Sequence, residues 1–322
     1  MLSLEFVEAE MLDSLKRQIS LGKLASTYIF SGSDAEKSKA LATAFAQALQ
    51  CEMKDFKLGC TCSSCRRIAS GVHPDVSWLG LDEEVNSIKI AEVREFQSAL
   101  ALKPYEGKYK VFIFNRAERL STEAQNALLK SLEEPPPSSI MILLVRENKL
   151  LFNTIESRAM KIRVPPFRTR ELEKLLIEEG AEGDEARFLA RVSSGSLGRA
   201  RSLWEESWFQ KKNEWLMHLK QNPDVFFEDF HGASKDEVLN LFSFLLSWLR
   251  DLIVIKIDGT SDSLIHKDSL IISQGIAEAC ELDALTELFE SMESIRRSLL
   301  DHANQKLALT RTQMIWTRVF HS

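Results

Sequence analysis

A continuous apolar run in the first half of the chain constrains the fold more than any other feature. Residues 140–145 read Ile-Met-Ile-Leu-Leu-Val. A strand with no polar alternation is buried on both faces, as in parallel sheets that helices cover. Similar strand-like runs alternate with helical patterns, the strands at 27–30, 76–81, 110–114 and 160–164 and the helices at 11–19, 39–49, 90–102 and 121–134. This alternation predicts an α/β domain with a central parallel sheet.

Helix start and stop signals divide the rest of the chain. Thr122 and Gln125 fit a capping box at the start of 121–134, and Pro135–Pro137 end that helix. After Pro166 the strand signals largely disappear, and three short helices are expected at 171–179, 184–193 and 198–208. Ser234 and Glu237 fit a second capping box before a long amphipathic helix. We therefore predict three parts: an α/β domain (1–166), a small helical lid (167–209) and a helical C-terminal domain (210–322).

Composition excludes several classes of protein. With 322 residues, 44% of them hydrophobic and 27% charged, the chain has a globular composition and room for two or three domains. Its net charge of −6 argues against a general DNA-coating protein. Apolar stretches at 241–249 and 252–255 are too short to span a bilayer, and the first residues carry no basic segment typical of a secretory signal. The sequence predicts a cytoplasmic protein that does not cross a membrane.

Four of the five cysteines lie within fifteen residues: Cys51, Cys60, Cys62 and Cys65. In a reducing compartment such a cluster indicates a metal site more often than disulfides, and free buried thiols are the alternative. His73 lies close enough in sequence to be a spare ligand, although a structural turn is the more ordinary role. The fifth cysteine, Cys280, is expected to be a buried apolar residue.

The turn after the first strand resembles a phosphate-binding loop only in part. Such a loop needs the pattern G-x-x-x-x-G-K-[ST], whereas residues 32–39 read Gly-Ser-Asp-Ala-Glu-Lys-Ser-Lys. If one residue is deleted, Lys37 and Ser38 provide the K-S pair, but Glu36 replaces the second glycine. After the strand at 110–114, Asn115 and Arg116 stand where hydrolysing enzymes carry acidic residues for Mg²⁺. The residues thus favour an ordinary strand-to-helix turn.

Several longer motifs resemble those of the bacterial clamp loaders, a family of AAA+ proteins, and in particular the delta-prime type of DNA polymerase III subunit. The matching segments are Gly71–Val76, Ile88–Ile90, Asn126–Pro136, Thr154–Arg158 and Asn304–Leu309. The resemblance implies a subunit of the pentamer that opens the ring-shaped sliding clamp and loads it onto primed DNA. It also implies partnership with the gamma/tau and delta subunits, and contact with the clamp and primer-template DNA through the complex.

The same resemblance assigns roles to individual residues. It implies that the cysteines, in a module at about 51–65, hold a structural Zn²⁺, and that the C-terminal domain is part of an oligomerisation collar. It implies that Arg158 is an arginine finger acting on the ATP of a neighbouring subunit, although from the residues alone Arg158 would be a surface arginine. Arg199 resembles a lid arginine, and Arg146 replaces a small polar sensor. Glu133 and Glu134 fit a solvated helix end better than an acid–base pair.

These inferences predict a clamp-loader stator that does not hydrolyse ATP by itself and is not catalytic alone. One alternative is an active motor subunit of the gamma/tau type, which Glu36, Asn115 and Arg116 disfavour. The other is a zinc-dependent hydrolase or redox protein, which the lack of a carboxylate base beside the cysteines disfavours.

Overall fold

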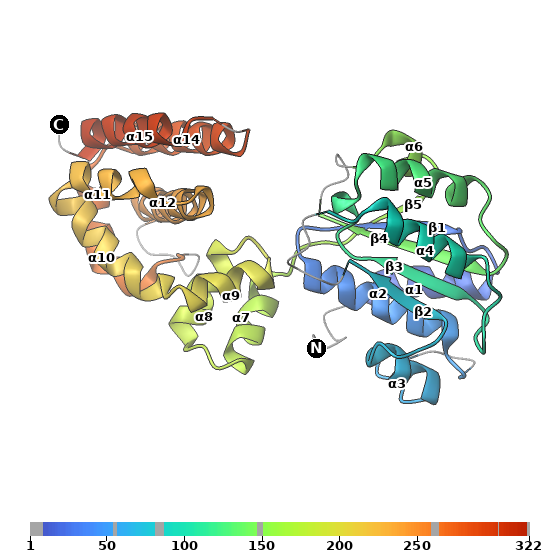
Figure 1. Cartoon of the computed structure of the whole chain (residues 1–322). Coiled ribbons are helices and arrows are strands. Elements are labelled where there is room, and N and C mark those ends of the chain that lie inside the picture. The colour runs from blue at the N-terminus through green and yellow to red at the C-terminus, as the bar shows by residue number, and fades with distance from the viewer. Residues whose placement is uncertain are drawn as a thin grey trace. The chain divides into compact units, whose positions relative to one another are not determined.

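A computed structural model describes residues 9–53, 57–80, 87–146, 151–258, 264–301 and 303–320 (Figure 1). The chain forms two compact units, which are described separately below. The first runs as far as Arg168 and also includes Gly195–Gly198. The second comprises Thr169–Ser194 and the chain from Arg199 onward.

The first unit is built on a five-stranded parallel sheet. The strands are β1 (Thr27–Ser31), β2 (Val76–Leu79), β3 (Lys110–Phe114), β4 (Ser139–Val145) and β5 (Met160–Arg163), in the order β2-β3-β4-β1-β5. The apolar run of the sequence is the central strand β4, in which every residue is buried. The predicted α/β domain with a parallel sheet is confirmed.

Helices cover both faces of this sheet (Figure 1). One face packs against α1 (Ala9–Ser20), α2 (Ala35–Gln50) and α3 (Ser63–Ala69), and the other against α4 (Ile90–Leu100), α5 (Thr122–Glu133) and α6 (Asn153–Glu156). Alternate residues of β4 supply the two cores: Ile142 faces α2, whereas Leu143 faces the α4–α5 side. Aromatic side chains fill each core, as where Phe96 of α4 meets the ring of Phe112 edge-on at 4.6 Å.

The order of the strands fixes where a ligand crevice can form. The chain leaves β1 through α2 on one face, whereas the crossovers that precede β3 and β4 run through α4 and α5 on the other face. In open α/β sheets, ligands bind beyond the carboxyl ends of the strands, at the point where the crossovers change face. That point lies between β1 and β4, beside Gly32 and Arg146.

The described regular elements of the second unit are all helical. Three short helices come first: α7 (Thr169–Glu178), α8 (Gly183–Val192) and α9 (Leu197–Glu205), of which α9 begins inside Gly195–Gly198 of the first unit. They are followed by α10 (Trp208–Gln221), α11 (Pro223–Asp229), α12 (Lys235–Asp258), α13 (Leu270–Ala279), α14 (Leu282–Leu300) and α15 (Gln305–Phe320). The division of this part into a lid and a collar stays a prediction.

Helix α12 is the centre of the second unit and packs against α8, α13 and α14. Among the described residues it is the one helix long and apolar enough to cross a membrane, with a mean hydropathy of 1.8 over its best window. However, 61% of that window is buried within the protein. Trp248 of α12 stacks on Trp316 of α15 with ring centroids 5.9 Å apart. These contacts are those of a core helix in a bundle.

One of the two predicted capping boxes is confirmed, and the other is wrong. Before α12, Ser234 N–H donates to Glu237 at 2.7 Å, and Glu237 N–H donates to Ser234 Oγ at 3.2 Å. At α5, Ser121 rather than Thr122 is the N-cap, because its Oγ accepts from the N–H of Ala124. The side chain of Gln125 instead accepts from the N–H of Phe152 at 2.9 Å.

Candidate functional site

The crevice beyond β1 and β4 is too small for a nucleotide as it stands. Its volume is about 10 Å³, roughly the space that one water molecule needs. It is lined by Gly32, Ala35, Ser38, Asn115, Arg116, Glu118, Leu144, Val145 and Arg146. The predicted residue Ser38 is therefore in this crevice, and its Oγ donates to the carbonyl of Asp34 at 2.9 Å.

Lys37, the other predicted phosphate ligand, does not line the crevice. Its side chain is 2% exposed, and its Nζ donates to the carbonyl of Pro166 at 3.4 Å. The ammonium also lies 5.0 Å from the ring centroid of Phe167, a distance at which a cation is attracted to an aromatic face. The structure thus separates the predicted pair, with Ser38 in the crevice and Lys37 against the segment that follows β5.

Asp34 is a residue that sequence reasoning missed. It is the N-cap of α2 and is 2% exposed. Its Oδ1 accepts from the N–H of Lys37 at 2.8 Å, and its Oδ2 accepts from the N–H of Leu197 at 2.8 Å and from Ser196 Oγ at 3.2 Å. Glu36 forms an ion pair with Lys39 at 3.2 Å. Of the two carboxylates at the start of α2, that of Asp34 therefore binds residues 196 and 197, whereas that of Glu36 pairs within the helix.

The two residues directly after β3, Asn115 and Arg116, bring no negative charge to the crevice. Asn115 is buried, and its Nδ2 donates to the carbonyl of Gly80 at 3.0 Å. Arg116 has a φ of 53°, in the left-handed region. Glu118 does line the crevice, a carboxylate to which the sequence analysis gave no weight. Arg146 is exposed and lies at the crevice directly after β4.

The four clustered cysteines come together as the sequence predicted. Their sulfur atoms all lie within 4.8 Å of one another, and the sulfurs of Cys51 and Cys60 are 3.7 Å apart. Four thiolates about 2.3 Å from a tetrahedral zinc would be about 3.8 Å apart. Cys51 is the C-cap of α2, and Cys62 is the N-cap of α3. The donor set and its spacing fit a closed four-sulfur metal site.

Hydrogen bonds distinguish the thiols within this cluster. Burial acts to raise the pKa of Cys62, but hydrogen bonds from the backbone N–H groups of Cys65 and Glu52 and from the thiols of Cys65 and Cys60 together lower that pKa to about 7. Burial raises the pKa of Cys51 to about 11 and that of Cys65 further still. A metal ion that binds here must displace protons from these thiols, because the thiolate is the ligand.

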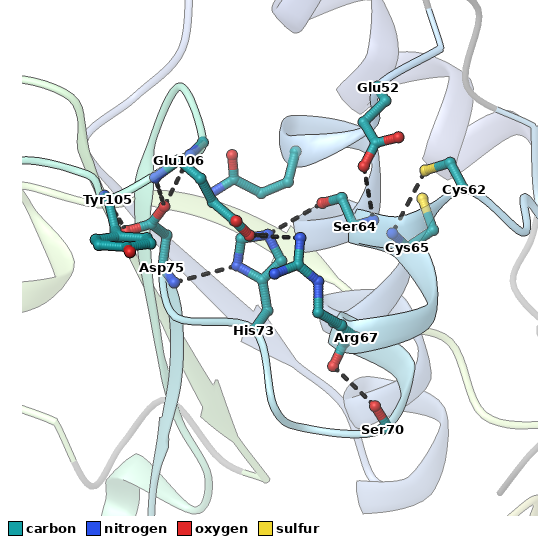
Figure 2. Close-up of polar contacts among 12 residues, drawn as sticks. Glu52, Cys62, Ser64, Cys65, Arg67, Ser70, His73, Asp75, Tyr105 and Glu106 are labelled. Carbon is teal, nitrogen blue, oxygen red and sulfur yellow. Dashed lines mark hydrogen bonds and ion pairs between the residues drawn. The ribbon is translucent and has the colours of Figure 1, made fainter.

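Figure 2 shows a polar network that attaches α3 to the rest of the first unit. His73 Nδ1 accepts from the N–H of Asp75 at 3.1 Å, so its Nε2 carries the proton and faces Ser64 Oγ at 3.1 Å. Burial lowers the pKa of His73, which keeps the ring neutral at pH 7. With both ring nitrogens engaged, His73 belongs to the turn and not to the thiol cluster. Arg67 and the same His73 nitrogen both contact Glu106, at 2.6 and 3.3 Å.

The carboxylate of Asp75 anchors the loop before β3 in the same network (Figure 2). It is fully buried and accepts from the N–H groups of Tyr105 at 2.6 Å, Glu106 at 2.9 Å and Gly107 at 2.8 Å. Burial alone would raise the pKa of Asp75, but these three donors hold it below its ordinary value.

Arg158, the predicted arginine finger, is an exposed residue two positions after α6. One guanidinium nitrogen donates to the carbonyl of Thr154 at 3.0 Å, and the other pairs with Glu133 of α5 at 3.0 Å. Glu133 is 54% exposed, in agreement with a solvated helix end. The side chain is therefore accessible from outside its own domain.

Arg199, the predicted lid arginine, hydrogen-bonds within the second unit. Its guanidinium donates to Asn240 Oδ1 at 3.2 Å and to Ser243 Oγ at 2.8 Å, both on α12. Burial, and then the charge of Arg296, lowers the pKa of Arg199. These contacts hold α9 against α12.

Comparisons with known proteins agree with the clamp-loader resemblance. Residues 7–168 match the family described as DNA polymerase III, delta subunit, and residues 207–318 match the family of its C-terminal region. The chain is 25% identical over 303 residues to DNA polymerase III subunit delta' of Bacillus subtilis (strain 168), which covers 90% of this chain and 91% of that protein.

Similarity to tau subunits is more partial. DNA polymerase III subunit tau of Escherichia coli (strain K12) is 29% identical over 207 residues, which is 62% of this chain but only 32% of that protein. Among solved structures, a gamma subunit-related protein of DNA polymerase III from Thermotoga maritima superposes with a TM-score of 0.42 at 18% identity, covering 96% of this chain and 99% of that one. Two family models match the chain, and its similarity to delta' of Bacillus subtilis extends over nine-tenths of both proteins. The chain therefore belongs to the DNA polymerase III delta-subunit family and groups with its delta' members.

Proposed function

We propose that this chain is the delta-prime subunit of a bacterial clamp loader and acts as its stator. In that role it assembles with the gamma/tau and delta subunits in the cytoplasm and helps to open the sliding clamp and load it onto primed DNA. Family membership supports the assignment to the clamp loader. The large helical second unit, which continues to Phe320, supports a part in holding the complex together.

The observation that carries the stator role is the small crevice beyond β1 and β4, together with the contact of Lys37. A loading motor must bind and hydrolyse ATP, yet the crevice has room for about one water molecule and Lys37 is bonded to Pro166. Phosphoryl transfer also needs acidic groups that hold Mg²⁺, whereas Asn115 and Arg116 follow β3 directly and Glu118 is the one carboxylate among the described residues that line the crevice. An active motor subunit is the alternative function, because the chain is also similar to a tau subunit. The crevice and its residues give this alternative less support than the stator role.

Arg158 is the residue that we propose to act in the mechanism, as an arginine finger directed at a neighbouring subunit's ATP. Its exposure on the surface of the first unit supports this role, since a finger must leave its own domain. The pair with Glu133 is itself exposed and contributes at most about 1 kcal/mol. A neighbour's triphosphate, with more charge than one carboxylate, can therefore displace Glu133 as the partner.

We propose that the four cysteines hold one structural zinc ion. Four sulfur ligands complete a tetrahedron and leave no position for a substrate or an activated water. This closed coordination also argues against a zinc-dependent hydrolase. Cys65 is fully buried and α3 begins directly after Cys62, so the ion would stabilise the start of α3 and its attachment to α2.

The proposed function is tested by reconstituting the loader with its gamma/tau and delta partners and measuring ATP hydrolysis stimulated by the clamp and DNA. Arg158→Ala should lower this rate partially, because one interface among several is affected, and should leave assembly intact. Arg158→Lys should rescue poorly, since lysine lacks the planar fork that contacts two oxygens. Arg163→Ala, at an exposed arginine of β5, is the matched control and should have no effect.

Two results would contradict the proposal. Normal stimulated hydrolysis by the Arg158→Ala complex would show that Arg158 is not an arginine finger. Failure of the chain to assemble with the partner subunits would contradict the clamp-loader role itself.

A further inference from the structure

The N-terminus of α2 has the backbone donors of an anion-binding site, and a carboxylate of the protein itself accepts from one of them. The first N–H groups of an α-helix have no partners within the helix and carry a partial positive charge, so helix N-termini bind phosphates and carboxylates. At α2 the anion is the carboxylate of Asp34, whose Oδ1 accepts from the N–H of Lys37 at 2.8 Å. Because Asp34 is 2% exposed, this position is closed to solvent.

The second oxygen of the same carboxylate reaches a distant part of the chain. Asp34 Oδ2 accepts from the N–H of Leu197 at 2.8 Å and from Ser196 Oγ at 3.2 Å. Residues 195–198 belong to the first unit, although the chain on both sides of them belongs to the second. One buried carboxylate thus joins the helix N-terminus to the point where the chain returns to the first unit.

Two further contacts hold the same corner. Phe167 N–H donates to the carbonyl of Gly195 at 3.0 Å, and Lys37 Nζ donates to the carbonyl of Pro166 at 3.4 Å. Gly195 has a φ of 78°, and a Cβ there would lie 2.6 Å from the carbonyl oxygen of Phe167. Only glycine fits so close an approach. The loop before α2, the segment after β5 and residues 195–198 therefore form one interlocked corner.

We propose that Asp34 is a permanent internal anion that takes the place of a nucleotide phosphate and holds residues 195–198 in position. In a nucleotide-dependent subunit, a bound phosphate would supply the negative charge at this helix terminus. Here the charge is covalently part of the chain, so the position of residues 195–198 is independent of ATP. This inference deepens the proposed stator function, on which it rests, because it gives a physical reason for a constant conformation.

Hydrogen–deuterium exchange of the isolated full-length chain tests the proposal. In the wild type, the amides of Lys37 and Leu197 should be protected, and neither Mg-ATP nor inorganic pyrophosphate at millimolar concentration should change their exchange. Asp34→Asn keeps an oxygen for Lys37 but turns an N–H₂ group toward Leu197. It should accelerate exchange at Leu197 by about tenfold or more, the loss expected for a hydrogen bond to a charged group, and leave Lys37 protected.

A second variant tests the anion site itself. Asp34→Ser retains a helix-capping side chain but is too short and uncharged to bind Leu197. Exchange at Leu197 should accelerate as in Asp34→Asn, and inorganic pyrophosphate should now slow exchange at Lys37, because the serine hydroxyl carries no charge and leaves the helix terminus without its anion. The matched control is Glu36→Gln, which removes a carboxylate from the same turn that pairs with Lys39 and should change neither amide.

Three outcomes would overturn the proposal: unchanged protection of Leu197 in both Asp34 variants, a response of the wild type to pyrophosphate, or no response of Asp34→Ser to pyrophosphate. None of these measurements involves the partner subunits. A chain that behaves as expected here but fails to assemble with a clamp loader would contradict the proposed function alone.

Discussion

Replacing Asp75 by asparagine should destabilise the first unit. The carboxylate is fully buried and accepts three backbone N–H groups, from Tyr105, Glu106 and Gly107. Asn has one acceptor oxygen, so at least one of these donors would face an N–H₂ group instead. Loss of a charge-assisted hydrogen bond together with a buried, unsatisfied N–H should cost about 2–4 kcal/mol. That is a large fraction of the roughly 5–15 kcal/mol by which a domain is stable.

The pH dependence of this cost follows from the direction of the pKa shift. The three N–H donors hold the pKa of Asp75 below its ordinary value although burial acts to raise it. A carboxylate with a depressed folded-state pKa stabilises the protein above its unfolded pKa, about 3.9, and this stabilisation is lost as the pH falls through the folded value. The difference between the wild type and Asp75→Asn should be constant near neutral pH and shrink below about pH 4.

Urea-dependent hydrogen exchange measures this effect, because peptides from β2 and β3 report on the first unit separately from the second. Asp13→Asn, at an exposed carboxylate that pairs with Lys16 in α1, is the matched control and should change stability by less than about 0.5 kcal/mol. Equal stability of Asp75→Asn and this control would refute the reasoning. So would a difference that stays the same at pH 3.

Three further predictions concern metal, ATP and the arginine. Protein purified without chelators should contain about one zinc per chain by elemental analysis. The Cys65→Ser variant should lose this zinc and the Cys280→Ser variant should keep it. Wild-type protein without metal would exclude the zinc site. The isolated chain should not hydrolyse ATP at a rate useful for loading, and a turnover that Lys37→Ala abolishes would establish the motor reading instead. Glu133→Gln should leave stability unchanged and should not reduce the stimulated ATP hydrolysis of the reconstituted loader, because Glu133 pairs with Arg158 only at an exposed surface. A loss of hydrolysis as large as that of Arg158→Ala would show that the ion pair itself is necessary.

The sequence predicted the sheet because the relevant signals are local. The run 140–145 lacks polar residues, and such a strand is typical of parallel sheets that helices cover on both faces. The cysteine cluster was equally predictable, since its four members lie within fifteen residues. Helix α3 was not predicted, because its seven residues include Cys65 and two arginines and carry little apolar periodicity.

The capping error at α5 shows where local signals become ambiguous. Ser121 and Thr122 can both cap a helix, but only Thr122 is followed three residues later by a side chain, that of Gln125, that could complete a capping box. The actual N-cap is Ser121. Gln125 is occupied elsewhere, since its side chain donates to the carbonyl of Leu120 and accepts from the N–H of Phe152. The contact with Phe152, on a segment that follows β4, selects the register, and nothing near residue 122 reveals it.

The sequence predicts a defective nucleotide site at residues 32–39, but it does not reveal the contacts of Asp34. Glu36 was the suspected carboxylate because it replaces a glycine of the motif, yet in the structure it pairs with Lys39. The sequence gives Asp34 no special role, since an Asp before a helix is an ordinary N-cap. Its second oxygen binds Leu197, 163 residues away, and Lys37 binds Pro166, 129 residues away. Such partners depend on which strand lies beside β1. A motif of eight residues therefore predicts that a phosphate site has lost its usual groups, whereas only the fold shows the contacts of the Asp34 carboxylate at the start of α2.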